Sequence, residues 1–429
     1  MESTITRSVR IDAAPLRDLI DGDVVTPDDD AWDEARLAWN LSVDQRPVAV
    51  ALPNSPADVV AVVTFARETG LRVAPQGTGH GAAALGDLSD TILLKTERLR
   101  GVEIDPEARL ARVGAGTIWI EVVEAAAEHG LAALAGSSPD VGVVGYTLGG
   151  GLSWLSRAYG LGANRVTAIE VVTAIEFELF PVEEVVAGIL WFPVERSVEV
   201  LKAWRAWTET VPDELTSVGR ILQFPPIPEI PEPVRGKSFV VVQAILLGNA
   251  AEADALLAPL RALGPVLDTV APMPVASLSQ LHMDPDGPAA GVGDGQLLDD
   301  ITEDTIEALV DRTVGAPLLS VELRHLGGAI ARRRPGHGAL AAFDASFAMY
   351  AVGALPVPEL RPAVEAAAAA VLDATSPHAS EHTYLNFAET RRSPQTLFSS
   401  ASYHRLRQIK ALVDPHGTIR SNHPIPPAR

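Results

Sequence analysis

The sequence has 429 residues, with 34 Lys or Arg against 55 Asp or Glu, which gives a net charge of −21. With 47% hydrophobic and 21% charged residues, the composition is typical of a globular protein of roughly two or three domains and excludes a disordered chain. The acidic balance disfavours nucleic acid and anionic membrane surfaces as partners, because both carry negative charge. A small molecule is the better expectation, and the absence of cysteine excludes disulfides, thiolate metal ligands and cysteine nucleophiles.

No segment of the sequence predicts export or membrane insertion. Residues 1–12 lack the apolar core of a secretory signal, and apolar runs such as Phe239 to Leu247 are shorter than the ~18 residues that a membrane span needs. We therefore expect a soluble, cytoplasmic protein. The sequence does not indicate its oligomeric state.

The N-terminal part predicts a domain of mixed strands and helices, because short apolar runs alternate with amphipathic stretches between residues 32 and 176. Val48 to Leu52 and Leu71 to Pro75 are expected to be strands. The helix between them begins at Ser55-Pro56 and ends at Gly70. Further strands are expected at residues 91–94, 101–104 and 110–113, with helices over residues 118–129 and 152–159.

Two glycine-rich stretches are the first candidate sites. The strand ending at Pro75 runs into Gly77-Thr78-Gly79-His80-Gly81, where three glycines leave backbone N–H groups bare and able to wrap an oxyanion. His80 is then either a nucleophile presented at the end of a strand or a polar residue filling a tight turn. The second stretch ends at Gly149-Gly150-Gly151, which is either a cofactor cradle or an element of close packing.

A local repeat follows these stretches. The pentapeptide Val166-Thr167-Ala168-Ile169-Glu170 recurs six residues later as Val172-Thr173-Ala174-Ile175-Glu176. The simplest interpretation is one long strand with accidental self-similarity, since an even offset keeps both copies on the same faces.

From about Pro181 the pattern predicts a second, α+β domain. Proline-rich connectors occur with a strand over Ser238 to Leu247 and helices over residues 250–263 and 360–372. A last helix is expected over residues 402–412, ending before Asp414-Pro415.

The common catalytic motifs of hydrolases and nucleotide-binding proteins do not occur in the sequence. There is no Walker loop, no Gly-x-Gly-x-x-Gly after a first strand, no Gly-x-Ser-x-Gly and no His-Glu-x-x-His. His378 and His382 are spaced for one helix face but lack a carboxylate partner motif, so we interpret them as surface residues and predict no metal site.

Taken together, these segments resemble the FAD-binding oxidoreductases of the berberine-bridge-enzyme-like group, within the vanillyl-alcohol-oxidase-type superfamily. The resemblance runs through most of the chain and rests on the order of its motifs. The segments are Ala38-Trp39-Asn40, Arg46-Pro47, Gln76 to Gly81, Arg112 to Gly116, Val141 to Gly151, Glu322 to Ala329, Tyr384 to Phe387, Asp414-Pro415 and Asn422 to Ile425.

The resemblance implies an α+β fold with a two-part FAD-binding domain of the PCMH type, formed by residues 1–180 and a returning C-terminal segment, residues 381–429. Residues 181–380 would form a central substrate domain built on an antiparallel sheet flanked by helices. It also implies that His80 is bonded to the 8α-methyl carbon of FAD. Family members that make a second bond use a cysteine where this chain has Ser138, so a single covalent link is expected.

The resemblance implies cofactor-binding and catalytic residues as well. The residues expected to contact FAD are Gly77, Thr78, Gly79, His80, Gly81, Ser138, Val141, Gly142, Gly145, Tyr146, Thr147, Gly149, Gly150, Gly151 and Asn386. Tyr384 is the expected catalytic base, which would require a lowered pKa, and Tyr350 is a second candidate that is otherwise a packed core tyrosine. Family members often carry an acid on the strand around Tyr350, and residues 347–350 supply none.

The expected activity is that of an oxidase. Hydride would pass from an alcohol or amine carbon of a small, fairly hydrophobic, secondary-metabolite-like substrate to flavin N5, and O2 would be reduced to hydrogen peroxide. Val141 matches the family's position for oxygen access, and a small residue there resembles an oxidase. The alternatives are a dehydrogenase with another electron acceptor and a flavin-poor, non-catalytic protein that binds small molecules.

The repeated pentapeptide marks a departure from the family. Relatives have a turn, a helix and a glycine run between two such strands, whereas here Glu170 is followed directly by Val171-Val172-Thr173. A deletion of a few tens of residues explains this, and it would place flavin affinity and closure of the pocket in doubt. The alternative is a loop missing from the sequence as given.

Overall fold

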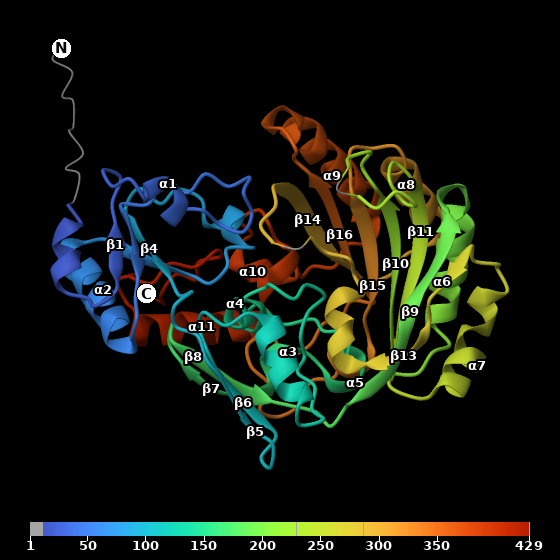
Figure 1. Ribbon diagram of the computed structural model, residues 1–429, viewed down its shortest axis with the longest axis horizontal. Helices are drawn as coiled ribbons and strands as arrows, with labels where there is room; N and C mark the ends of the chain where they lie inside the picture. Colours follow the sequence, from blue (N-terminus) through green and yellow to red (C-terminus); the bar gives the residue numbers. More distant parts are fainter. Residues whose placement is uncertain (1–11, 229, 286, 429) are drawn as a thin grey trace.

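The computed structural model describes residues 12–228, 230–285 and 287–428, and within them the strands form three sheets. Two four-stranded sheets lie in the N-terminal part, and an eight-stranded sheet lies in the central part (Figure 1). This mixture of helices and sheets confirms the predicted α+β class. No helix of the described residues has the length and apolar character needed to cross a membrane.

The first sheet positions the loop that contains His80. Its strand order is β1 (Asp23–Val25), β2 (Ala49–Leu52), β4 (Thr91–Lys95) and β3 (Arg72–Gln76), with β2, β4 and β3 parallel. Between β2 and β3 runs α2 (Pro56–Thr69), where the Ser55 side chain caps the first turn and Gly70 ends the helix at φ 74°. The predicted strand, helix and strand are therefore confirmed, and the chain leaves β3 directly into Gly77.

The second sheet has the order β5 (Val102–Asp105), β6 (Leu110–Gly114), β8 (Ala174–Glu178) and β7 (Val166–Glu170). The helix α3 (Trp119–Ala127) follows β6, and its buried residues share an apolar core with β6 and β8. β7 is the first copy of the repeated pentapeptide, and β8 begins with the last three residues of the second copy and continues to Glu178. They pair antiparallel, so the interpretation of the repeat as one long strand is wrong.

The reversal between β7 and β8 is strained. The Thr173 N–H donates to the Glu170 carbonyl at 3.0 Å, which closes a four-residue turn, and Val172 in that turn has φ 69°. A β-branched residue in this left-handed region is an outlier, because its branched side chain crowds the backbone there. At the edge of the sheet, β7 leaves Ile169 half exposed, and Val171 in the turn is 74% exposed.

The central sheet provides two different faces. Its strands are β9 (Glu184–Pro193), β10 (Leu215–Gln223), β11 (Ser238–Leu246), β12 (Leu267–Asp268), β13 (Ala271–Pro274), β14 (Gly291–Leu298), β15 (Ser320–His325) and β16 (Phe347–Ala354). One face is covered by four helices with a large apolar core: α6 (Ser197–Thr208), α7 (Ala250–Arg261), α8 (Glu303–Thr313) and α9 (Arg361–Thr375). The other face is turned toward the N-terminal elements (Figure 1), and Trp154 and Leu155 pack on it.

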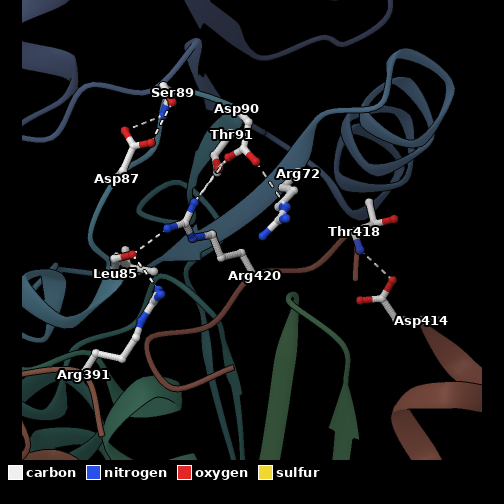
Figure 2. A network of polar contacts seen from close by, with 10 residues as sticks. All are labelled: Arg72, Leu85, Asp87, Ser89, Asp90, Thr91, Arg391, Asp414, Thr418 and Arg420. Atoms are coloured by element: carbon white, nitrogen blue, oxygen red, sulfur yellow. Dashed lines mark hydrogen bonds and ion pairs between the residues drawn. The ribbon is translucent and has the colours of Figure 1, made fainter. Parts of the chain in front are cut away.

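The C-terminal segment returns to the first sheet. After the short helix α10 (Pro394–Leu397) and α11 (Ser400–Val413), Ile419 forms a parallel bridge with Val73 of β3. Figure 2 shows the arginines that fasten this segment: Arg420 donates to the Leu85 carbonyl at 2.7 Å, and Arg391 donates to the same carbonyl at 3.0 Å. The described N-terminal part also contains three short helices. α1 (Trp32–Ala35) lies between β1 and β2 in the chain, and α4 (Val143–Leu148) and α5 (Ser156–Tyr159) lie between α3 and β7.

Candidate functional site

The loop of residues 77–81 leaves β3 with its backbone donors free. Its N–H groups donate no hydrogen bond to another described residue. The loop also meets the second glycine-rich stretch, because a Cβ on Gly142 would lie 3.7 Å from the backbone nitrogen of Thr78. The structure therefore brings the two predicted stretches together around a group of bare amides, which is the arrangement that binds phosphate oxygens.

His80 is held from three sides. The ring of Trp39 stacks on the imidazole at 4.0 Å with an interplanar angle of 19°. Thr78 Oγ1 lies 2.7 Å from Nδ1, and Asp140 Oδ1 lies 3.4 Å from Nε2. Trp39 thus covers one face of the ring, while Thr78 and Asp140 lie at its two nitrogens.

Asp140 is a site residue that the sequence analysis missed. Besides facing His80, it accepts a hydrogen bond from the Trp39 indole Nε1 at 2.5 Å and one from Ser138 Oγ at 3.0 Å. Burial opposes ionisation of this carboxyl, but the contacts with His80 and Trp39 outweigh it, and the pKa of Asp140 is lowered. The only available signal was its place two residues after Ser138, because the chain carries many other aspartates.

Several buried polar atoms in the two stretches have no hydrogen-bond partner among the described residues. They are Gln76 Nε2, His80 Nε2, Tyr146 Oη and Thr147 Oγ1. Buried polar atoms are normally paired, so a cluster of unpaired ones indicates a place for a ligand with polar groups. Together with the bare amides, this set of donors fits the phosphate and ring polar groups of FAD.

The glycines of the second stretch fall into two groups. Gly142 precedes α4 and Gly145 lies inside it, and a Cβ on Gly145 would meet no atom within 4 Å. In contrast, a Cβ on Gly149 would lie 1.7 Å from Asn386 Oδ1, and one on Gly150 would lie 2.9 Å from the ring of Tyr384. The triple glycine is thus filled by protein side chains, as the close-packing alternative requires, while Gly145 stays open.

Tyr384 is buried, and its hydroxyl oxygen is hydrogen-bonded on two sides. Its hydroxyl oxygen accepts hydrogen bonds from the Leu152 N–H and from Asn386 Nδ2, both at 2.9 Å. Burial raises its pKa to about 12, and the donated hydrogen bonds only partly offset that effect. These surroundings are the opposite of what a tyrosine base needs near neutral pH. Asn386 also donates to the Tyr146 carbonyl at 3.0 Å and so links the C-terminal segment to α4.

Tyr350 is paired with an acid that comes from another segment. Its hydroxyl donates a hydrogen bond to Glu389 Oε1, five residues after Tyr384 in the chain. Burial raises the pKa of Glu389 to about 7, and the nearby Asp294 carboxylate adds to the effect. A carboxyl that titrates near neutral pH suits proton transfer. Tyr350 on the central sheet therefore has an acidic partner that comes from the C-terminal segment.

A row of polar residues crosses the same face of the central sheet. Arg220, Glu322 and Tyr350 lie directly opposite one another on β10, β15 and β16. Glu322 is 2.8 Å from both Arg324 Nε and His282 Nε2. Although burial alone would raise it, the positive charges of Arg324 and its neighbours lower the pKa of Glu322. The face turned toward the N-terminal elements thus carries an ionised, buried carboxylate.

The remaining predicted residues lie at the edges of this arrangement. Ser138 contacts Asp140, and Val141 is partly buried against the core of the second sheet. One hollow in the described residues is lined by Trp154 and Leu278, and another is lined by Leu340 and Phe398. His80 lines neither of these two. No group of three residues suited to bind a metal occurs in the described ranges.

Family models match both ends of this two-part arrangement. The model described as "FAD binding domain" matches residues 47–175, and the model described as "Berberine and berberine like" matches residues 383–426. The first match ends inside β8, next to the strained turn, and the second contains Tyr384, Asn386 and Glu389. The two matches cover the glycine-rich stretches and the segment that returns to them.

Relatives of known sequence include oxidases. (R)-6-Hydroxynicotine oxidase of Paenarthrobacter nicotinovorans is 34% identical over 162 residues, which is 38% of this chain but only 35% of that protein. An uncharacterized FAD-linked oxidoreductase of Bacillus subtilis is 25% identical over 458 aligned residues, covering 95% of this chain and 97% of the relative. This alignment is longer than the 429-residue chain by 29 positions, so the relative contains at least that many residues without a counterpart here.

Solved structures share the fold across nearly the whole chain. BBE-like 1 of Physcomitrella patens superposes with a TM-score of 0.82 at 19% identity, covering 96% of this chain and 98% of that one. 6-Hydroxy-D-nicotine oxidase from Arthrobacter nicotinovorans superposes with a TM-score of 0.79 at 23% identity, covering 97% and 100%. The predicted fold is thereby confirmed.

Proposed function

Because this chain belongs to the berberine-bridge-enzyme-like group of FAD-linked oxidoreductases, we propose that it is an oxidase that acts on an alcohol or amine carbon of a small organic substrate. The observation that carries the proposal is the convergence of bare amides and unpaired polar atoms around His80. The oxidase named for 6-hydroxynicotine supports the activity class and not the substrate.

In this proposal the loop of residues 77–81, together with Gly142 and Gly145, holds the diphosphate of FAD, and His80 carries the single covalent link. When bound, FAD supplies the acceptor for a hydride from the substrate, and dioxygen takes the electrons on to hydrogen peroxide. The other steps belong to the chain. Glu389 accepts a proton through Tyr350 as the substrate C–H bond is broken, and Val141 leaves room for dioxygen.

The polar row on the central sheet indicates the chemical character of the expected substrate. A buried carboxylate on Glu322, flanked by Arg324 and His282, offers both an acceptor and donors on the face turned toward the cofactor domain. A substrate with polar groups beside the oxidised carbon fits this face better than the fairly hydrophobic one expected from the sequence.

The test uses purified full-length protein after incubation with FAD. The proposal predicts a yellow protein whose flavin colour stays with the acid-precipitated polypeptide. It also predicts bleaching of that flavin under anaerobic conditions by a member of an alcohol and amine panel, followed by peroxide formation when air is admitted. Colourless protein that takes up no FAD would contradict it, and bleaching without reaction with O2 would indicate a dehydrogenase.

A second candidate function is a flavin-poor protein that binds small molecules without catalysis. It is favoured by the strained turn at Val172 and the exposed edge strand β7, which stand where the family model match ends. An aligned relative with at least 29 residues that have no counterpart in this chain agrees with a lost segment. Calorimetric titration with FAD decides between the two, since only the oxidase requires tight binding.

A further inference from the structure

The surroundings of His80 single out one residue beyond those expected to contact FAD. We propose that Asp140 is the positioning residue that fixes the imidazole of His80 for covalent attachment of the flavin. The inference rests on the proposed function, because it concerns the same link. Its evidence is independent of the glycine loops, since it comes from the contacts of Asp140 itself.

The first step of the argument concerns the two ring nitrogens. Thr78 Oγ1, at 2.7 Å from Nδ1, is able to donate or accept a hydrogen bond, whereas the ionised Asp140 carboxylate, at 3.4 Å from Nε2, only accepts. A lone pair on Nε2 facing this carboxylate would be repelled, so the proton of the neutral imidazole belongs on Nε2. Nδ1 then keeps its lone pair, and the Thr78 hydroxyl donates to it.

The second step concerns the distance between Asp140 and His80, which is longer than that of an ordinary hydrogen bond. The separation of 3.4 Å is within ion-pair distance, but Nε2 still lacks a hydrogen-bond partner among the described residues. Two other donors, Trp39 Nε1 and Ser138 Oγ, hold the carboxylate in place at 2.5 and 3.0 Å. The position of the carboxylate is therefore set by its hydrogen bonds with Trp39 and Ser138, and not by its contact with the imidazole.

The third step is the chemistry of attachment. The new bond joins Nδ1 to the 8α carbon, which loses a proton while the electron pair of its C–H bond passes to the flavin ring. Dioxygen then removes this pair, with two protons, as hydrogen peroxide. Positive charge develops on the imidazole as its nitrogen forms the bond, and Asp140 stabilises that charge and accepts the Nε2 proton. An aspartate beside a histidine in a protease triad acts on tautomer and charge in the same way.

Trp39 also holds His80 and Asp140 in position, although it supplies no proton acceptor. Its ring covers one face of the imidazole, and its indole N–H orients Asp140, so the ring and the carboxylate are held as a unit. A purely structural reading of Asp140 is that it only anchors Trp39. The two interpretations differ in their predictions. If Asp140 only anchors Trp39, Asp140→Asn should behave like wild type, because its amide oxygen still accepts the indole N–H, whereas Trp39→Phe loses the anchor.

The experiment measures covalent incorporation of FAD into purified apoprotein as the flavin that stays with the polypeptide after acid precipitation. We expect Asp140→Asn to lower the rate of incorporation at least tenfold while it still takes up FAD that acid releases. In Trp39→Phe, which keeps the Asp140 carboxylate, the rate of incorporation should fall by less than threefold. Asp87→Asn is the matched control, since this exposed carboxylate contacts Ser89 and lies outside the site.

The outcomes separate this inference from the function on which it rests. Incorporation in Asp140→Asn at the wild-type rate, or an equal loss in Trp39→Phe, would overturn the role of Asp140. Wild-type protein without any acid-stable flavin would instead overturn the proposed link at His80. Nitrogen NMR of labelled wild-type apoprotein tests the role of Asp140 without any variant. A proton on Nε2 of His80 is expected, and a proton on Nδ1 would contradict the inference.

Discussion

The glycine-rich segments contain two kinds of region, one with free backbone donors and open space and one filled by protein side chains. The N–H groups of residues 77–81 donate no hydrogen bond to another described residue, and a Cβ on Gly145 would meet no atom within 4 Å. Neighbouring polar atoms such as Thr147 Oγ1 lack hydrogen-bond partners among the described residues. Around Gly149 to Gly151, the space is filled by Asn386, Tyr384 and Tyr146. Glycines alike in sequence therefore have different uses, and unsatisfied polar groups distinguish a ligand site from a packing element.

The most direct test of this comparison adds one methyl group at an open glycine and one at a filled glycine of the second stretch. Gly150→Ala places a Cβ 2.9 Å from the Tyr384 ring at φ 124°, so crowding and backbone strain together should lower the free energy of unfolding by roughly 3 to 4 kcal/mol. Gly145→Ala meets no atom within 4 Å and lies inside α4, so it should raise stability by up to about 1 kcal/mol. Urea denaturation of the apoproteins measures both.

The two variants should rank in the opposite order when FAD binding is measured instead of stability. Gly145→Ala is expected to weaken FAD binding because its methyl group enters the open space, whereas folded Gly150→Ala should bind FAD nearly as wild type does. Equal stability losses in the two variants, or unchanged FAD affinity in Gly145→Ala, would remove the distinction between an open and a filled glycine position.

A second prediction concerns Tyr384 in the filled region. Tyr384→Phe leaves the Leu152 N–H and the Asn386 amide without their acceptor, and unpaired buried donors should cost about 2 kcal/mol of stability. Because its pKa is raised to about 12, we expect the residual oxidase activity of the folded variant to follow the wild-type pH profile. A variant of normal stability whose reductive half-reaction is abolished would show that Tyr384 is the base after all.

A third prediction concerns the pH dependence caused by Glu389. Its pKa is raised from 4.5 in the unfolded chain to about 7 in the folded one, so between these values the folded state holds the extra proton. Stability contributed by this group is therefore present at low pH and falls as the pH rises from 4.5 to 7. In Glu389→Gln this fall should be absent, so the variant gains on the order of 2 kcal/mol relative to wild type across that window.

Urea midpoints at pH 4.5 and pH 7.5 for both proteins test this prediction. Asp294→Asn serves as a companion variant, because removing the neighbouring negative charge should lower the pKa of Glu389 and shift the window to lower pH. Identical pH profiles for wild type and Glu389→Gln would mean that Glu389 titrates as an ordinary carboxyl.

The smallest expected effect lies in the turn between β7 and β8. Val172→Gly relieves left-handed strain of ~1–2 kcal/mol, which stabilises the folded state. The lost packing and the greater entropy of the unfolded chain offset part of this gain, so we expect a net stabilisation of roughly 0.5 kcal/mol. Val171→Gly, at an exposed position with an ordinary φ, should instead lose about 0.5 kcal/mol. Thermal denaturation of the pair measures both signs, and a loss in both would mean that the turn is not strained.

Local signals in the sequence predicted β2, α2 and β3 well, because Ser55 and Gly70 fix the ends of α2 through the cap and the left-handed turn, whereas β1 was not predicted. The positions of Asp140 and Glu389 were not predictable, since each acquires its role from a residue distant in the sequence or on another element. The reversal at Val172 was missed because the residue itself disfavours the turn. Tertiary packing overrides local preference at these points, and two of them lie in the candidate site.

The most direct test of the central claim is the intact mass of FAD-treated wild-type protein and His80→Ala under denaturing conditions. We predict that the wild-type polypeptide is heavier than its sequence by one FAD molecule, and that His80→Ala has the mass of its sequence alone while still binding FAD reversibly in native buffer. A wild-type polypeptide at its sequence mass, or a His80→Ala polypeptide that still carries the flavin, would contradict the account.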